Sequence, residues 1–209
     1  RFARKYADPS AALFYNDYDT FLPWKREVIC EQVLKPLLSE GLADGMGMQS
    51  HMTMQTPSLE EYEKTVRTFG RLGLEIQVTE LDIHNADPSR QSMEALAERY
   101  RDIFTILTRA KKEGMADITG VTFWGMQDDD SWLTGFRKER SYPLLFQNGF
   151  RPKAAYQAVL GVPGIVESDT PDRLPGGERF AFWEKTPVFV KEYHVNKSHP
   201  GASDDNDGS

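Results

Sequence analysis

Stretches with the pattern of strands alternate with amphipathic helical stretches four times along this chain, and no other feature limits its fold as strongly. The strand-like stretches cover residues 11–20, 44–52, 74–84 and 118–133, and the helical stretches cover residues 24–40, 57–73, 87–114 and 152–161. Strands separated by helices pair in parallel through right-handed crossovers. The alternation therefore predicts an α/β fold, either an open doubly wound sheet or half of a (β/α)8 barrel, and periodicity does not separate the two.

Individual residues mark the ends of the predicted helices. Ser58 and Glu61 form the pattern of a capping box at the start of the second helix. Pro88 falls near the first turn of the third helix, and Gly114 lies just past its end. In the first helix, Pro36 interrupts the apolar pattern, so we expect a kink there.

Polar and aromatic residues gather where the predicted strands end. They are Asn16, Asp17 and Tyr18, then Gln49 and His51, then Glu80 and Asp82, and finally Trp124, Asp128, Asp129, Asp130 and Trp132. In parallel α/β sheets and barrels the functional site lies at the C-terminal ends of the strands. The sequence therefore predicts one site along this edge of the sheet.

The third strand brings two carboxylates to that edge. Alternate residues of a strand share a face, so we expect Val78, Glu80, Asp82 and His84 to point the same way. A carboxylate is costly to bury unless a partner pairs with it. A chain of contacts from Asp82 through His51 to Glu80 would keep Glu80 ionised and fixed in place. The alternative is that these are ordinary strand-end residues paired with surface lysines.

Two tryptophans suggest the kind of ligand. Sugar rings have apolar faces that stack on indoles, so Trp124 and Trp132 are typical of a carbohydrate cleft. Both could instead be core residues, although Trp132 follows three aspartates in a predicted loop. That acidic run lacks the spacing of an EF-hand. The histidines lack zinc spacing and no phosphate-binding glycine motif is present, so we expect no metal and no cofactor.

Charge and composition exclude several classes of partner. The formal net charge of −7 argues against a nucleic acid or an anionic membrane as the partner. No apolar run is long enough to cross a membrane. The single cysteine, Cys30, excludes an internal disulfide and fits a buried core position. These features fit a globular protein that acts on a neutral or cationic ligand.

Taken together, the strand-end motifs resemble glycoside hydrolase family 10, the endo-1,4-β-xylanases. "LFYNDYD", "GMGMQSHM", "VTELDIH" and "GVTFWGMQDDDSWL" are similar to the fifth to eighth barrel strands of that family, in order, and "PLLFQNGFRPKAAYQAV" is similar to its closing loop and helix. The resemblance covers about residues 1–165. It implies a (β/α)8 TIM barrel, of which this chain supplies roughly the last four strand–helix units.

The resemblance also implies roles for particular residues. Glu80 would be the catalytic nucleophile, His51 its hydrogen-bond partner, and Asp82 the residue that orients His51. The substrate-binding residues would be Gln49 in the −1 sugar subsite, Trp124 and Trp132 as its walls, and Asn16 and Tyr18 near the bond that is cleaved. The implied reaction is double-displacement hydrolysis of internal β-1,4-xylosidic bonds of xylan, with retention of configuration.

The family's first four strands have no counterpart in this sequence, and the acid/base glutamate goes with them. Retaining hydrolysis needs two carboxylates, so we expect the chain alone to be poorly active. Three explanations stay open: the missing half is a lost or separate N-terminal chain, a second copy of this chain completes the barrel, or the chain is a non-catalytic carbohydrate-binding remnant. Another retaining β-1,4-glycanase, such as a cellulase, is the alternative enzyme.

The expected domain boundary lies near residue 165. Residues 166–209 are predicted to be a linker and an aromatic tail, with one strand at Val188–Tyr193 and a disordered end. The chain begins without a signal peptide, and we expect a secreted or periplasmic protein only because the implied substrate is a polymer. The expected partner is xylan or a xylo-oligosaccharide, and the missing half or a second copy of the chain is a further candidate partner.

Overall fold

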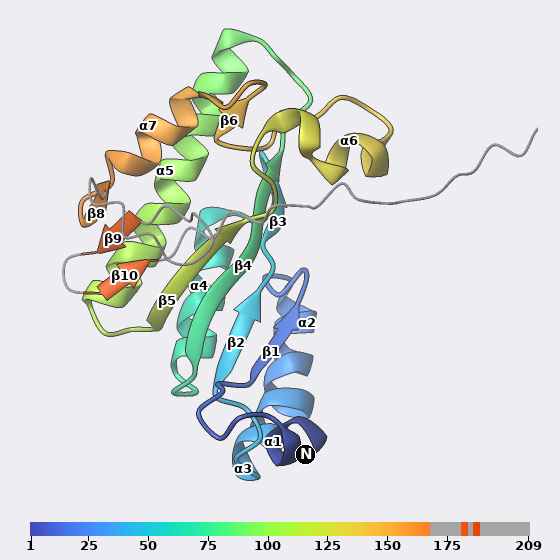
Figure 1. The fold of residues 1–209 in the computed structure, drawn as a ribbon, viewed down its shortest axis with the longest axis vertical. Helices are drawn as coiled ribbons and strands as arrows, with labels where there is room; N and C mark the ends of the chain where they lie inside the picture. Colours follow the sequence, from blue (N-terminus) through green and yellow to red (C-terminus); the bar gives the residue numbers. More distant parts are fainter. Residues whose placement is uncertain (168–180, 184–185, 189–209) are drawn as a thin grey trace, which may run out of the picture.

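The computed structural model describes residues 1–167, 181–183 and 186–188 (Figure 1). Its main sheet is parallel, with β2 and β3 lying end to end along β4, β1 beside β2, and β5 on the other side of β4. The strands are β1 (Phe14–Asp17), β2 (Gly45–Met48), β3 (His51–Thr53), β4 (Glu75–His84) and β5 (Asp117–Phe123). The strand–helix alternation thus becomes the parallel sheet that it predicts.

Helices connect the strands, and α2, α4 and α5 lie behind the sheet in the view of Figure 1. The helical segments are α1 (Phe2–Tyr6), α2 (Pro23–Val28), the π-helical η1 (Ile29–Leu34), α3 (Lys35–Ser39), α4 (Leu59–Gly70), α5 (Arg90–Lys112), α6 (Trp132–Arg137) and α7 (Ala154–Leu160). The Ser58 side chain caps α4 by accepting a hydrogen bond from the Glu61 backbone, which is one half of the predicted capping box, while the Glu61 carboxylate pairs with Arg26 instead. Gly114 follows the end of α5 with a φ of +67°, a conformation that favours glycine.

The hydrophobic core fills the space between the sheet and these helices. The strands contribute Met46, Met48, Ile76, Val78, Ile118 and Val121, and the helices contribute Tyr62, Phe69, Tyr100, Phe104 and Leu107. Each of these side chains is at most 2% exposed. Burial of one such side chain stabilises a fold by about 1.5–3 kcal/mol, so this layer holds the strand ends, and the site on them, in place.

The other face of the sheet carries polar and small residues. Glu75 accepts hydrogen bonds from the side chains of Gln77 and Thr119 there. A Cβ atom added to Gly45 would lie 2.2 Å from the Phe14 ring, so only glycine lets β1 and β2 place that ring there. Within the described residues, β1 pairs only with β2 and β5 only with β4. The outer edges of β1 and β5 therefore have no hydrogen-bonded partner strand among the described residues, as in an incomplete barrel.

Three predicted elements are wrong in detail. The helix over residues 24–40 is divided into three segments, with a π-helical turn before Pro36 and the proline in the first turn of α3, where its missing N–H is tolerated. The strand over residues 44–52 is divided into β2 and β3. The acidic loop after β5 forms a 3₁₀ turn at Asp128–Asp130 and then α6, which the sequence pattern does not predict.

Short antiparallel pairs follow the main sheet. They are β6 (Phe146–Gln147) with β7 (Arg151–Pro152), and β8 (Ile165–Glu167), β9 (Ala181–Trp183) and β10 (Thr186–Val188) in a second small sheet. Beyond Val188, the predicted strand at Val188–Tyr193 lies outside the described residues, as do the predicted linker and the C-terminal end. Among the helices that the structure describes, none combines the length and the apolar character that a membrane span requires.

Candidate active site

Glu80, His51 and Asp82 form a connected row at the C-terminal end of the sheet. His51 Nε2 lies 3.1 Å from Glu80 Oε2, and His51 Nδ1 lies 3.0 Å from Asp82 Oδ1. The Asp82 side chain is fully buried, whereas those of His51 and Glu80 are 18% and 16% exposed. The structure therefore brings these three predicted residues together and leaves one side of the row open to a ligand.

An extra residue in β4 sets the direction of Glu80. Met48 pairs with Val78, but His51 pairs with Asp82, so β4 has one more residue than its neighbour over this interval. The register with β5 shifts over the same interval. A bulge of this kind re-aims a side chain at a site.

The bulge overturns the prediction that Val78 shares a face with Glu80. Val78 lies in the core behind the sheet, because the extra residue changes the alternation between it and Glu80. Strict alternation would place Thr79 and Glu80 on opposite faces. Instead, both side chains contact Asn16.

Asn16 is held so that it presents its amide N–H to Glu80. Its Nδ2 donates a hydrogen bond to Glu80 Oε1 at 3.3 Å, and its Oδ1 accepts one from Thr79 Oγ1 at 2.8 Å. A Cβ atom at Gly47 would lie 2.5 Å from Asn16 Oδ1, so the glycine makes room for the amide. Sequence reasoning missed Thr79, because nothing in the sequence marks the bulge that turns it toward Asn16.

Both predicted tryptophans border the row. Trp132 Nε1 donates a hydrogen bond to Asp82 Oδ2 at 2.8 Å, and its ring centroid lies 5.1 Å from that of His51. The Trp124 ring lies edge-on to His51 at 6.2 Å. Trp124 is 41% exposed and Trp132 39%, so neither is the core residue of the alternative interpretation.

The break between β2 and β3 places His51. Ser50 has a φ of +63°, which is unusual for a residue other than glycine. Its buried hydroxyl lies within hydrogen-bonding distance of Tyr62 Oη on α4, at 3.2 Å. Gln49 is half-buried beside Glu80, and its backbone carbonyl accepts the Glu80 N–H. The structure thus places Gln49 at the row through its backbone.

Tyr18 stands apart from the row of Glu80, His51 and Asp82. It is 57% exposed, and Lys25 Nζ lies 3.4 Å from the centroid of its ring. Lys25 also forms an ion pair with Asp17 at 2.9 Å. Lys25 and Asp17 therefore hold Tyr18 at the rim of the site, beside the start of α2.

The charges around His51 favour its protonated form. Burial lowers the pKa of the imidazole, but the hydrogen bonds and charges of Asp82 and Glu80 outweigh it, so the pKa lies above its usual value. Burial raises the pKa of Asp82, and its contacts with His51 and Trp132 offset part of this. Only an imidazolium can donate from both ring nitrogens at once. A protonated His51 can therefore donate a hydrogen bond to Glu80 and to Asp82 at the same time.

This arrangement predicts a loss of stability as the pH rises. Because the folded-state pKa of His51 exceeds the unfolded value of about 6.5, its stabilising contribution is complete below that pH and disappears as the pH passes the folded-state pKa. We expect the free energy of unfolding, measured by urea denaturation, to fall as the pH rises above about 6.5.

The matched control is the double substitution of His51 and Asp82 by asparagine, which removes both titrating groups. In this variant the pH dependence over that pH range should flatten. An unchanged pH dependence would show that other groups cause it.

The described residues contain no group of three or more histidine, cysteine, aspartate or glutamate side chains placed to hold a metal ion. The aspartates after β5 have other partners. Asp128 pairs with Lys153, Asp129 with Arg140, and Asp130 accepts a hydrogen bond from Gln127. These contacts fold the loop that presents Trp132, which agrees with a structural role for the acidic run.

A comparison with curated proteins finds endo-1,4-beta-xylanases whose sequences are similar to this chain. Endo-1,4-beta-xylanase B of Butyrivibrio fibrisolvens is 54% identical over 172 residues, which cover 82% of this chain and 27% of that protein. An endo-1,4-beta-xylanase of Geobacillus stearothermophilus is 38% identical over 169 residues, covering 75% of this chain and 50% of that protein. The chain therefore spans half or less of the length of these two relatives.

A comparison with solved structures also finds a family 10 xylanase with a similar fold. The Thermobacillus composti GH10 xylanase matches with a TM-score of 0.68 and 37% identity, over 76% of this chain and 54% of that one. A mutant in complex with xylotriose matches with a TM-score of 0.67 and 34% identity, over 76% of this chain and 51% of that one. The family model of glycosyl hydrolase family 10 matches residues 1–162. The chain therefore belongs to glycosyl hydrolase family 10, and its parallel strands are part of the (β/α)8 barrel of that family.

Proposed function

We propose that this chain carries the nucleophile of a retaining endo-1,4-β-xylanase. The observation that carries the proposal is the row of Glu80, His51 and Asp82, in which the partly exposed Glu80 carboxylate is held by His51 near two exposed tryptophans. The names of the relatives support xylan as the substrate. A polymeric substrate of this kind favours secretion.

In the first step, Glu80 attacks the anomeric carbon and forms a glycosyl ester while the bond to the leaving sugar breaks. In the second step, water attacks the same carbon, releases Glu80 and restores the original configuration. The Asn16 amide and His51 hold the two oxygens of Glu80. The indoles of Trp124 and Trp132 offer apolar surfaces to the sugar ring.

The leaving sugar needs a proton, and Asp82 is a poor candidate to supply it. Its carboxylate is fully buried and already engaged with His51 and Trp132. The acid therefore comes from elsewhere in a complete barrel, in line with the relatives being about twice as long as the matched region or longer. We infer that the chain alone cleaves natural xylan poorly.

A mechanism-based label tests the nucleophile separately from the acid. A 2-fluoro-xylobioside with a dinitrophenolate leaving group needs no proton donor, and the fluorine slows release of the glycosyl ester. We expect intact-mass spectrometry to show one added xylobiosyl group, and peptide mapping to locate it on Glu80. Natural xylan treated in parallel should remain nearly uncut. A label on any other residue, or brisk cleavage of xylan that depends on Glu80, would contradict the proposal.

A further inference from the structure

A second hollow lies outside the row of Glu80, His51 and Asp82, between the start of α5, the hairpin of β6 and β7, and the start of α7. It is a pocket of about 430 Å³, and no residue of that row lines it. Pockets for small organic ligands begin at about 300 Å³, so this one has room for a single sugar ring.

A buried ion pair closes the inner end of the pocket. Lys153 Nζ lies 3.0 and 3.1 Å from the two oxygens of Asp128 and donates to the Tyr142 carbonyl at 2.9 Å. Asp128 also accepts the Leu144 N–H at 2.9 Å. The side chains of Asp128 and Lys153 are 4% and 8% exposed. Since they neutralise each other, neither adds a net charge to the pocket.

Within the described residues, Arg151 gives the pocket an unpaired positive charge in a chain of net charge −7, whereas the other arginine of the lining, Arg140, is paired. Arg140 pairs with Asp129 and lies over the ring of Tyr142, 5.6 Å from its centroid. Arg151 donates from Nε to the Asn148 carbonyl, and no carboxylate in the described part of the chain forms an ion pair with it. Its exposed guanidinium is therefore free to bind a carboxylate, because its N–H groups can donate two parallel hydrogen bonds to the two carboxylate oxygens.

The rest of the lining suits a sugar ring. Pro88, Met93 and the ring of Tyr142 supply apolar surface, and the exposed amides of Gln147 and Asn148 supply donors and acceptors for hydroxyl groups. A small inorganic anion would use only the charge. A ligand with a carboxylate, hydroxyl groups and an apolar ring face would use all three.

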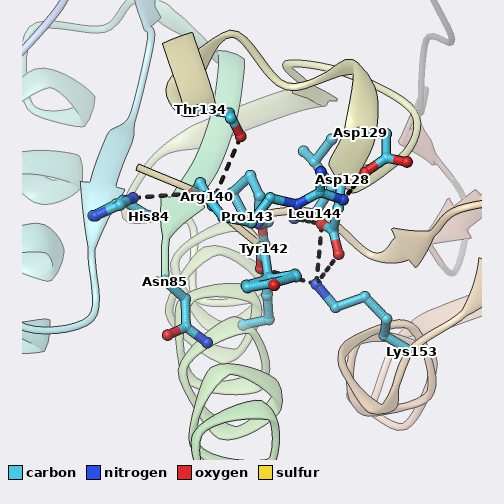
Figure 2. A network of polar contacts seen from close by, with 12 residues as sticks. His84, Asn85, Asp128, Asp129, Thr134, Arg140, Tyr142, Pro143, Leu144 and Lys153 are labelled. Atoms are coloured by element: carbon cyan, nitrogen blue, oxygen red, sulfur yellow. Dashed lines mark hydrogen bonds and ion pairs between the residues drawn. The ribbon is translucent and has the colours of Figure 1, made fainter. Parts of the chain in front are cut away.

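One short segment connects this pocket with the strand that carries Glu80. Figure 2 shows residues 140–144 between His84 and Lys153. His84, two residues after Asp82, has its ring nitrogens 3.0 Å from Ser141 Oγ and 3.1 Å from Glu139 Oε1. Arg140 and Tyr142, which alternate with those residues, line the pocket.

We propose that this pocket binds a pyranose that carries a carboxylate. Arg151 pairs with the carboxylate, and the part of the pocket formed by Tyr142 contacts the sugar ring. The source is either a free hexuronic acid or a uronate substituent on a xylan chain. The charge and shape of the pocket do not depend on the function of Glu80. The choice of a sugar acid over other organic acids rests on the proposed function.

Isothermal titration calorimetry of the full 209-residue chain tests this with D-glucuronate, D-glucose, acetate, inorganic phosphate and a xylo-oligosaccharide that carries one glucuronate. We expect glucuronate to bind at least about tenfold more tightly than glucose, acetate or phosphate. Arg151→Gln should remove that preference. Arg71→Gln, an exposed arginine after α4, is the matched control and should keep it.

The outcomes separate the sources and the two proposals. Binding of free glucuronate alone identifies the free acid, and tighter binding of the decorated oligosaccharide identifies the substituent. Phosphate or acetate binding as tightly as glucuronate, or glucuronate binding unchanged by Arg151→Gln, would overturn the inference. Each titration is repeated with Glu80→Gln, which should leave glucuronate binding unchanged, so a failure of the label on Glu80 does not count against the pocket.

Discussion

Replacement of Glu80 by glycine is expected to reduce the rate of reaction with an activated xylobioside by at least about 1,000-fold, or about 4 kcal/mol in the activation barrier. Glu80 is the carboxylate that His51 and Asn16 hold at the open side of the site, and no glycosyl ester can form without it. The release of dinitrophenolate, followed by absorbance, measures the rate. A loss of less than about tenfold would exclude Glu80 as the nucleophile.

The glycine variant also allows a chemical rescue. Azide can occupy the space that the carboxylate leaves, and it should restore turnover and give a glycosyl azide of inverted configuration. Glu75→Gln is the matched control, because Glu75 lies at the other end of β4 and pairs with Thr119 and Gln77 instead. That variant should keep its rate and should gain nothing from azide.

Replacement of Lys153 by methionine is expected to cost about 3–5 kcal/mol of stability, because it leaves the carboxylate of Asp128 buried without its partner. Burial already raises the pKa of Asp128 and lowers that of Lys153, and for each of them the attraction of the other is the largest effect that offsets burial. The lysine also holds the Tyr142 carbonyl, so the segment before α7 should loosen as well. Urea denaturation of both proteins measures the difference.

A second substitution separates the loss of charge pairing from the loss of packing. Asparagine at position 128 can still accept the hydrogen bond from Leu144 but carries no charge. The double variant Lys153→Met with Asp128→Asn should therefore regain much of the lost stability. Equal stability of the single and double variants would mean that the cost comes from packing of the lysine stem.

The sequence predicts the architecture well because its signals are local. Apolar periodicity, the Ser58 cap and Gly114 after α5 each act within a few residues, and they place the helices and strands in the right order. The site is also foreseen in outline. Parallel strands must end at one edge, so His51, Glu80 and Trp132 come together from three separate stretches of the chain.

The failures of sequence reasoning depend on tertiary contacts. The bulge in β4 requires both neighbouring strands to fix the register, and strict alternation therefore misplaces Val78 and misses Thr79. Ser50 adopts a positive φ although nothing in its side chain requires it. The pair of Asp128 and Lys153 joins residues that are far apart in the sequence, so neither shows a partner until the chain is folded.

Within the described residues, no strand is hydrogen-bonded to the outer edge of β1 or of β5, so the formation of a complete barrel competes with aggregation through these edges. Unpaired strand edges join any extended chain that they meet, so self-association speeds up with protein concentration. Complementing strands on the same polypeptide would meet these edges at an effective concentration of about a millimolar, whatever the dilution. If the complementing strands were on a separate chain, that chain would have to be present at a higher concentration than the aggregating species in order to pair first. The covalent connection between two halves of such a barrel is therefore itself a protection against aggregation.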